Sequence, residues 1–160
     1  MHTSQGPLLL SVWYRPPSAD AELIHKFEEE WRRHSVDVMG TVVIGDMNVH
    51  HLYWLKYSRG TSPAGRKLYA FCGANNFEER VKQPTHDGNL LDLVLTDMPA
   101  HVTATVHPKL ADHAFVVAKL SFDVPHHVAV EREFWQFHKA DWNGFSLKNP
   151  PIGIPSSVTM

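Results

Sequence analysis

Apolar and polar positions along the first third of the chain predict a strand followed by a helix. A short apolar run at residues 8–14 predicts a buried strand, and the prolines at 16 and 17 end it because proline cannot donate to a sheet ladder. Residues 19–34 then carry apolar side chains at helical spacing with charged residues between them. This second pattern predicts an amphipathic helix.

The rest of the pattern predicts one more helix between strands. The β-branched run at residues 41–44 is typical of a central strand. Ser62 and Pro63 offer an N-cap followed by proline at the first helical position, which predicts a second helix. Short strands separated by proline and glycine turns are predicted at residues 78–83, 90–96, 102–106 and 114–122. The order strand, helix, strand, helix, strands indicates a layered α/β fold.

The pattern changes after Pro125, where histidines, aromatic residues and a Pro/Gly/Ser-rich end replace the alternating strands. A chain of 160 residues is within the usual size of one domain. We therefore predict a single domain at residues 1–125 and a linker-like tail with one short helix at residues 126–160.

Charge and cysteine content narrow the classes of function. The net charge of −2 argues against a dense basic surface, because affinity for nucleic-acid phosphates grows with the lysines and arginines presented. Any nucleic acid is therefore expected to be held weakly and locally. The single cysteine, Cys72, excludes an intrachain disulfide, and the sequence shows no secretory or membrane signal. These features predict an intracellular protein, nuclear or cytoplasmic, without membrane association.

Polar residues with potential chemistry follow the predicted central strand. Asp46 and Asn48 stand where this strand ends, and their spacing of two residues puts them on one side of the chain. From such a position polar side chains can face a ligand crevice. A strand-ending turn is the alternative, because glycine, aspartate and asparagine all favour turns.

Two later positions suggest a paired carboxylate and imidazole. Asp92 lies within an otherwise apolar strand, where an unpaired carboxylate would be costly to bury. A histidine is a natural partner, because a carboxylate that accepts from one ring nitrogen fixes the tautomer; solvent exposure of Asp92 is the alternative. Asp112 and His113 precede the last predicted strand and could bind a hard cation and move protons, or could form an exposed turn.

These motifs together resemble the endonuclease/exonuclease/phosphatase superfamily, and most closely the endonuclease domain of non-LTR retrotransposon (endonuclease-reverse transcriptase) polyproteins. The resemblance covers about residues 8 to 122, and the tail resembles the linker before the reverse transcriptase in such elements. Met47 and Ala111 stand where the family usually has phenylalanine and serine. The motifs that carry the resemblance are Tyr14-Arg15-Pro16-Pro17, Gly45-Asp46-Met47-Asn48, Thr85 with Asn89 and Asp92, and Asp112-His113.

The resemblance implies a fold and an activity. The expected fold is the C-terminal portion of a DNase I-like four-layer α/β sandwich, with a mixed, mostly antiparallel sheet and flanking helices. The expected activity is hydrolysis of DNA phosphodiesters with Mg²⁺ or Mn²⁺ as the cofactor.

The resemblance also implies a role for each matching residue. Asp112 would be a metal-side carboxylate, while Asp46 and Asn48 would orient the attacking water and contact the phosphate. Asp46 would act as the base or as a water-orienting carboxylate. Asp92 would align His113 to stabilise the pentacovalent state. Tyr14 would donate a hydrogen bond to a phosphate oxygen.

One departure from the family concerns the start of the sequence. Family members begin with a half-domain that supplies an asparagine and a metal-binding glutamate, and the sequence before Leu8 matches neither. We therefore expect an exposed sheet face that could favour self-association.

Three alternatives to an active endonuclease follow from the sequence. A catalytically inactive remnant of a mobile element is suggested by the departure at the start. A histidine-based metal-binding module is suggested by His50-His51 and His126-His127, although no spacing matches a finger-type site. A dinuclear metallophosphoesterase would need an Asp-x-His before Gly45, which the sequence lacks.

Overall fold

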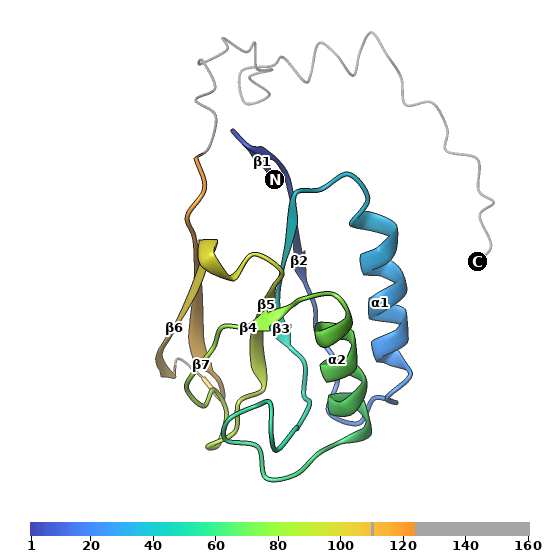
Figure 1. Cartoon of the computed structure of the whole chain (residues 1–160). Coiled ribbons are helices and arrows are strands. Elements are labelled where there is room, and N and C mark those ends of the chain that lie inside the picture. Colours follow the sequence, from blue (N-terminus) through green and yellow to red (C-terminus); the bar gives the residue numbers. More distant parts are fainter. Residues whose placement is uncertain (110, 124–160) are drawn as a thin grey trace, which may run out of the picture. The chain divides into compact units, whose positions relative to one another are not determined.

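A computed structural model of the chain describes residues 1–109 and 111–123, which fold as mixed α/β structure (Figure 1). The helical elements are α1 (Leu23–His34), α2 (Pro63–Ala74) and the short 3₁₀ helix η1 (Pro99–His101). The strands are β1 (His2–Thr3), β2 (Gly6–Val12), β3 (Gly40–Asp46), β4 (Glu78–Glu79), β5 (Asp92–Thr96), β6 (Val102–Lys109) and β7 (Ala114–Leu120).

The described strands form two sheets. The larger sheet has the order β1-β2-β3-β5-β4, and β6 pairs with β7 as a separate antiparallel hairpin. Among the described strands, only the β2–β3 pairing is parallel, and α1 makes the crossover between these two strands. The sheets are therefore mixed and mostly antiparallel, as the sequence predicted.

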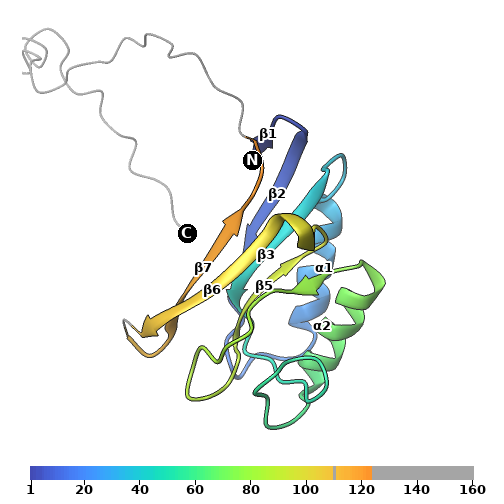
Figure 2. The same cartoon turned by 60° about the vertical axis from the view of Figure 1, so that its left-hand side comes forward.

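These elements stack in layers. Both helices cover one face of the five-stranded sheet, and the β6–β7 hairpin covers the other face (Figure 2). On the helix side, the Phe27 ring meets Trp13 at 5.3 Å and Phe71 at 5.2 Å, both edge to face. On the hairpin side, Val106 and Val116 pack against the core, because alternate residues of each strand point inward. The predicted α/β architecture with flanking helices is confirmed.

Several element boundaries differ from the sequence prediction for local reasons. The strand predicted at residues 78–83 is limited to β4. The backbone N–H of Val81 donates to the carboxylate of Glu79 and is therefore not available to a neighbouring strand. The strand predicted from residue 90 begins only at Asp92, because Thr85 Oγ1 accepts from the backbone N–H groups of Leu91 and Asp92. By contrast, Ser62 caps α2 as predicted, with its side chain accepting from Gly65 N at 3.0 Å.

β2 and the chain after it approach β3 closely at Gly45, so a substitution there tests how much this packing contributes to stability. A Cβ added at Gly45 would lie 1.7 Å from the Trp13 carbonyl oxygen, a contact that requires the two strands to separate. We expect Gly45→Ala to lower the free energy of unfolding by about 1 to 3 kcal/mol or more, measured by urea denaturation. Gly73 in α2 is the matched control, because its added Cβ meets nothing within 4 Å. Gly73→Ala should raise stability by about 0.5 to 1 kcal/mol, and equal effects at both positions would contradict this account.

Part of the hairpin-side surface is uncovered. Leu8 is buried on this face of β2, whereas Leu10 is 46% and Val12 is 80% exposed further along the strand. On the hairpin itself, Phe115 and Val117 are exposed on the face of β7 opposite to Val116. Self-association through an exposed face stays a prediction.

The predictions about membrane association and about the domain boundary can be compared only with the described residues. Within residues 1–109 and 111–123, no helix combines the length and apolar character needed to cross a bilayer. The predicted tail at 126–160 lies outside the described residues, so the domain boundary stays a prediction.

Candidate active site

The site begins with two carboxylates at one end of the β3–β5 ladder. Asp46 is the last residue of β3, Asp92 is the first residue of β5, and the two are direct partners in this antiparallel pair. Directly opposite residues project to the same face with their Cβ atoms about 5 Å apart. The fold therefore holds two like charges side by side.

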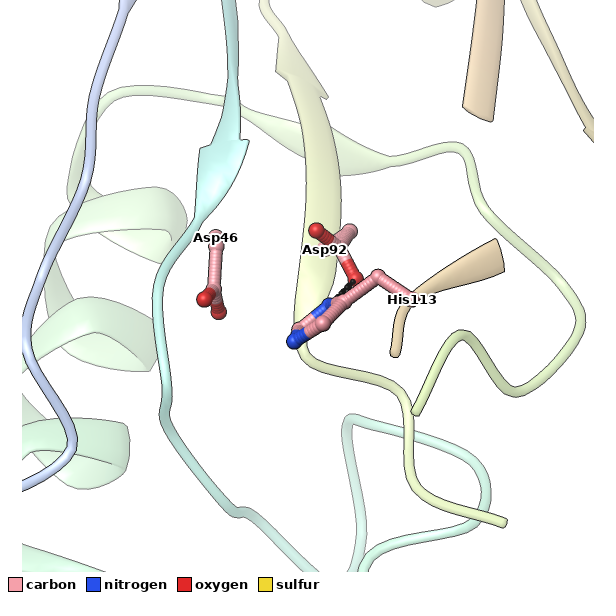
Figure 3. A group of neighbouring side chains, drawn as sticks. All are labelled: Asp46, Asp92 and His113. Atoms are coloured by element: carbon pink, nitrogen blue, oxygen red, sulfur yellow. Dashed lines mark hydrogen bonds and ion pairs between the residues drawn. The ribbon is translucent and has the colours of Figure 1, made fainter. Parts of the chain in front are cut away.

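His113 completes the group from the other sheet. It directly precedes β7, and its Nδ1 lies 2.7 Å from Asp92 Oδ2 (Figure 3). Because an ionised carboxylate only accepts, Nδ1 carries the proton and Nε2 is turned away from Asp92. The partner that the sequence required for Asp92 is thus a histidine, as expected.

Asp46, Asp92 and His113, which we call the carboxylate–histidine cluster, are close enough to share one cation. Each offers a ligand atom, and these three atoms lie within 4.8 Å of one another (Figure 3). Within the described part of the chain, this is the one such group of three or more acidic, histidine or cysteine side chains.

The closeness of these charged groups shifts the pKa values of Asp46 and His113. Burial and the Asp92 charge raise the pKa of Asp46 above its ordinary 3.8, although His113 and Asn48 oppose the shift. For His113, the hydrogen bond to Asp92 raises the pKa above its ordinary 6.5, against a smaller effect of burial. A cation beside Asp46 would remove the cost that its ionised form carries.

Asn48 is held next to Asp46 by a local backbone arrangement. Its φ of +47° is left-handed, a conformation that asparagine tolerates, and its backbone N–H donates to Asp46 Oδ1 at 3.2 Å. The Asn48 amide donates to the Arg15 carbonyl at 2.9 Å. In return, the buried Arg15 guanidinium donates to the Asn48 carbonyl at 3.0 Å. Arg15 therefore ties the end of β2 to the loop after β3, a role that the sequence gave no means of assigning.

Space for a ligand lies beside Asn48. Arg15, Asn48 and His50 line a pocket of about 330 Å³ at the N-terminal end of α2. His50 and Ser62 are shared with a neighbouring pocket of about 440 Å³, which Arg59 also lines. The positive end of the α2 dipole and Arg59 favour anions here.

Thr85 connects both halves of the Asp92–His113 pair. Its buried hydroxyl oxygen accepts from Asp92 N at 3.1 Å, and its carbonyl accepts from Ala114 N at 2.7 Å. The residues next to His113 and the start of β5 are thereby fixed to one another. The motif that contains Thr85 was visible in the sequence, but this positioning contact depends on the three-dimensional register.

Two predicted site residues lie apart from the cluster. Asp112 is exposed and is not one of the three residues that can share a cation, although its charge contributes to raising the His113 pKa. Tyr14 is 64% exposed at the end of β2. Their proposed roles as metal ligand and phosphate contact stay predictions.

The histidine-based metal site gains no support from the first histidine pair. His51 is buried, and its Nδ1 accepts from Trp54 N at 3.2 Å, so this nitrogen is already used within the fold. The second pair, His126 and His127, lies outside the described residues.

The electrostatics of His113 predict a titration. In the metal-free protein, we expect the His113 pKa to lie above 6.5, measured from the pH dependence of its Cε1–H proton resonance. Protonated His113 stabilises the folded state through its bond to Asp92. This contribution to the free energy of unfolding is fully present below pH 6.5 and is lost as the pH rises through the higher pKa of the folded state. Asp92→Asn should bring the midpoint back down. An unchanged midpoint in that variant would show that Asp92 is not the cause.

Comparison with known proteins places this geometry in a family. A family model described as "Endonuclease-reverse transcriptase" matches residues 8–117, from β2 into β7, and so includes the whole carboxylate–histidine cluster. The chain belongs to this family. The search of curated proteins found no match to this chain.

A solved structure supports the fold. The chain is similar to the endonuclease domain of TRAS1, a telomere-specific non-LTR retrotransposon, with a TM-score of 0.53 and 18% identity. The similarity covers 68% of this chain and 55% of the TRAS1 chain. The resemblance noted in the sequence, and the fold that it implied, are confirmed.

Proposed function

We propose that this domain hydrolyses DNA phosphodiesters with the help of a divalent cation. The observation that carries the proposal is the His113–Asp92 hydrogen bond of 2.7 Å beside Asp46, within a family of endonuclease-reverse transcriptases. An imidazole oriented by a carboxylate, next to a second carboxylate, is suited to acid–base and electrostatic catalysis at a phosphate.

The residues present fit a hard cation, Mg²⁺ or Mn²⁺. Asp46 and Asp92 supply carboxylate oxygens, the ligands such ions prefer, and the raised pKa of Asp46 marks charge that a cation would neutralise. The resemblance seen in the sequence would add the carboxylate of Asp112, the residue before His113, although Asp112 is not part of the cluster. Bound there, the cation would offset the negative charge that develops on the phosphate and the leaving oxygen.

The side chains divide the remaining work. Asp92 holds His113 in the tautomer with the proton on Nδ1, which directs Nε2 toward the reacting phosphate. The protonated imidazole donates to a phosphate oxygen and stabilises the pentacovalent state. Asp46 accepts a hydrogen bond from the attacking water and orients it. Asn48 and Tyr14 contact the phosphate.

Weak retention of DNA is part of the proposal. The chain carries a net charge of −2, so binding relies on local features such as the anion-favouring pockets that His50 and Ser62 line. Because few phosphates are contacted in this way, we expect cleavage to fall only moderately with added salt.

Plasmid nicking tests the proposal. The purified chain is incubated with supercoiled plasmid and Mg²⁺ or Mn²⁺, beside Asp46→Ala and the control Asp123→Asn, which changes an exposed carboxylate outside the cluster. We expect nicking by the wild type and the control and its loss in Asp46→Ala. Absence of nicking, or nicking that Asp46→Ala leaves unchanged, would refute the proposal. Cation binding without nicking is the result expected of a catalytically inactive member of the family.

A titration with Mn²⁺ separates the candidate ligands. The affinity of the wild type, followed by calorimetry, is compared with that of Asp46→Asn, Asp92→Asn and Asp112→Asn. We expect the first two substitutions to weaken binding because they remove oxygens within the cluster. Weaker binding in Asp112→Asn would place that exposed carboxylate among the ligands, and unchanged binding would restrict the site to the cluster.

A further inference from the structure

His86 lies against His113 although 26 residues separate them in the sequence. The two imidazole rings stack with their centroids 4.4 Å apart and their planes inclined by 29°. His86 Nδ1 is also 3.1 Å from the Asp112 carbonyl oxygen. Because a carbonyl only accepts, His86 donates this bond, and it therefore contacts both the His113 ring and the peptide group before it.

The segment that carries His86 is a tight turn held by its own hydrogen bonds. Asp87 and Gly88 have φ values of +44° and +77°, the left-handed conformation at both central positions of a two-residue hairpin turn. Around them His86 N donates to the Asn89 carbonyl at 3.0 Å, and Asn89 N donates back to the His86 carbonyl at 2.8 Å. The Asp87 carboxylate adds contacts to His86 Nε2 at 3.3 Å and to Lys109 Nζ at 3.1 Å.

Consecutive residues of this segment hold the backbone on both sides of His113. Thr85 fixes Ala114 through its carbonyl, and His86 fixes Asp112 through its ring. Neither of these contacts limits rotation of the His113 ring itself. The Asp92 hydrogen bond holds one ring nitrogen, and the stacked His86 ring restricts the plane.

We propose that His86 is a positioning residue for the reaction, which keeps the His113 ring plane in the orientation that points Nε2 at the phosphate. This inference rests on the proposed function, since it assigns His86 a part in the same reaction. A group that is displaced by about 1 Å can lose about 100-fold in rate even when it is still present. Loss of His86 should therefore lower kcat and leave KM nearly unchanged, because His86 acts through His113 and does not contact the substrate.

Three substitutions separate the two contacts of His86. His86→Ala removes both contacts, His86→Phe keeps a ring for stacking, and His86→Asn keeps an N–H donor for the Asp112 carbonyl. His101 supplies a matched control, because its ring stacks on Phe122 at 4.9 Å and its Nδ1 lies 3.2 Å from the Ser121 carbonyl oxygen. His101→Ala therefore removes the same kinds of contact at a histidine that touches no residue of the cluster.

Turnover and apparent substrate affinity give the first readout. We expect His86→Ala to lower kcat by about 10- to 100-fold, with KM within about threefold of the wild-type value, and His86→Phe to recover most of the loss. His101→Ala should leave kcat and KM unchanged, whatever its effect on Tm. Equal kcat values for His86→Ala and His101→Ala would overturn the proposal. If His86→Ala does not fold, the Phe and Asn variants decide, and wild-type kcat in both would overturn it as well.

A second readout does not depend on activity. In the metal-free protein, long-range ¹H–¹⁵N spectra report the His113 Nδ1–H that donates to Asp92, assigned by its loss in His113→Gln. We expect this proton to exchange faster with water in His86→Ala than in the wild type or His101→Ala. An unchanged exchange rate would refute the positioning role. If the wild type shows no cleavage, the proposed function fails, whereas this comparison still decides whether His86 orients His113.

Discussion

Replacing His113 with alanine is expected to lower the rate of plasmid nicking by about 10²- to 10⁴-fold, the range in which general acid–base groups contribute. The expectation follows from the 2.7 Å bond to Asp92, which fixes one ring nitrogen and leaves the other to act at the phosphate. The rate is measured from the conversion of supercoiled to open-circular plasmid under single-turnover conditions.

Two further variants distinguish a catalytic effect of His113→Ala from a loss of folding. Asp92→Asn keeps the volume of the side chain but removes the ionised acceptor, so we expect a loss of rate that approaches that of His113→Ala. His107→Ala removes an exposed histidine on β6 outside the cluster and should leave the rate unchanged. A His113→Ala rate within threefold of wild type would show that the imidazole takes no part in the reaction.

The substitution Asp46→Asn is expected to abolish cleavage and yet to stabilise the metal-free protein. Asp46 faces Asp92 across the β3–β5 ladder, and burial together with this like charge raises its pKa. A neutral amide removes both costs. We expect a higher Tm than wild type at pH 7 without metal, measured by calorimetry, together with a loss of nicking of at least about 100-fold.

The pH dependence of this stability difference checks its origin. Because the folded-state pKa of Asp46 is raised above 3.8, the stability due to its protonated form is fully present below pH 3.8. That stability is lost as the pH rises through the folded pKa. The Tm advantage of Asp46→Asn should therefore be small near pH 3.8 and should grow toward neutral pH. Adding Mg²⁺ should raise the Tm of the wild type and not that of the variant. A lower Tm for Asp46→Asn throughout would show that this carboxylate stabilises the fold.

Much of the secondary structure could be predicted because its signals are local. Ser62 and Pro63 mark the start of α2 as the structure has it, and the β-branched run before Gly45 forms the core of β3. Two of the boundaries that were wrong, the end of β4 and the start of β5, depend on single side chains that accept from a backbone N–H next to the strand, as Glu79 does for Val81. No pattern of apolar residues reports such a bond.

The candidate site was predictable to a lesser degree. The need of Asp92 for a partner followed from its apolar neighbours, and a histidine supplies it. That Asp46 stands opposite Asp92 follows from the register of β3 and β5, and the stacking of His86 on His113 from the docking of the hairpin. Both are long-range relations, which a single sequence does not encode in any local signal.

The cluster takes its members from two sheets, and this has a consequence for how the protein matures. Asp46 and Asp92 belong to the five-stranded sheet, whereas His113 arrives with the hairpin that packs upon it. A folding intermediate with every helix and strand formed, but with the hairpin still undocked, would hold two repelling acids and no working centre. Any activity that needs all three side chains would therefore require the hairpin to be docked on the larger sheet.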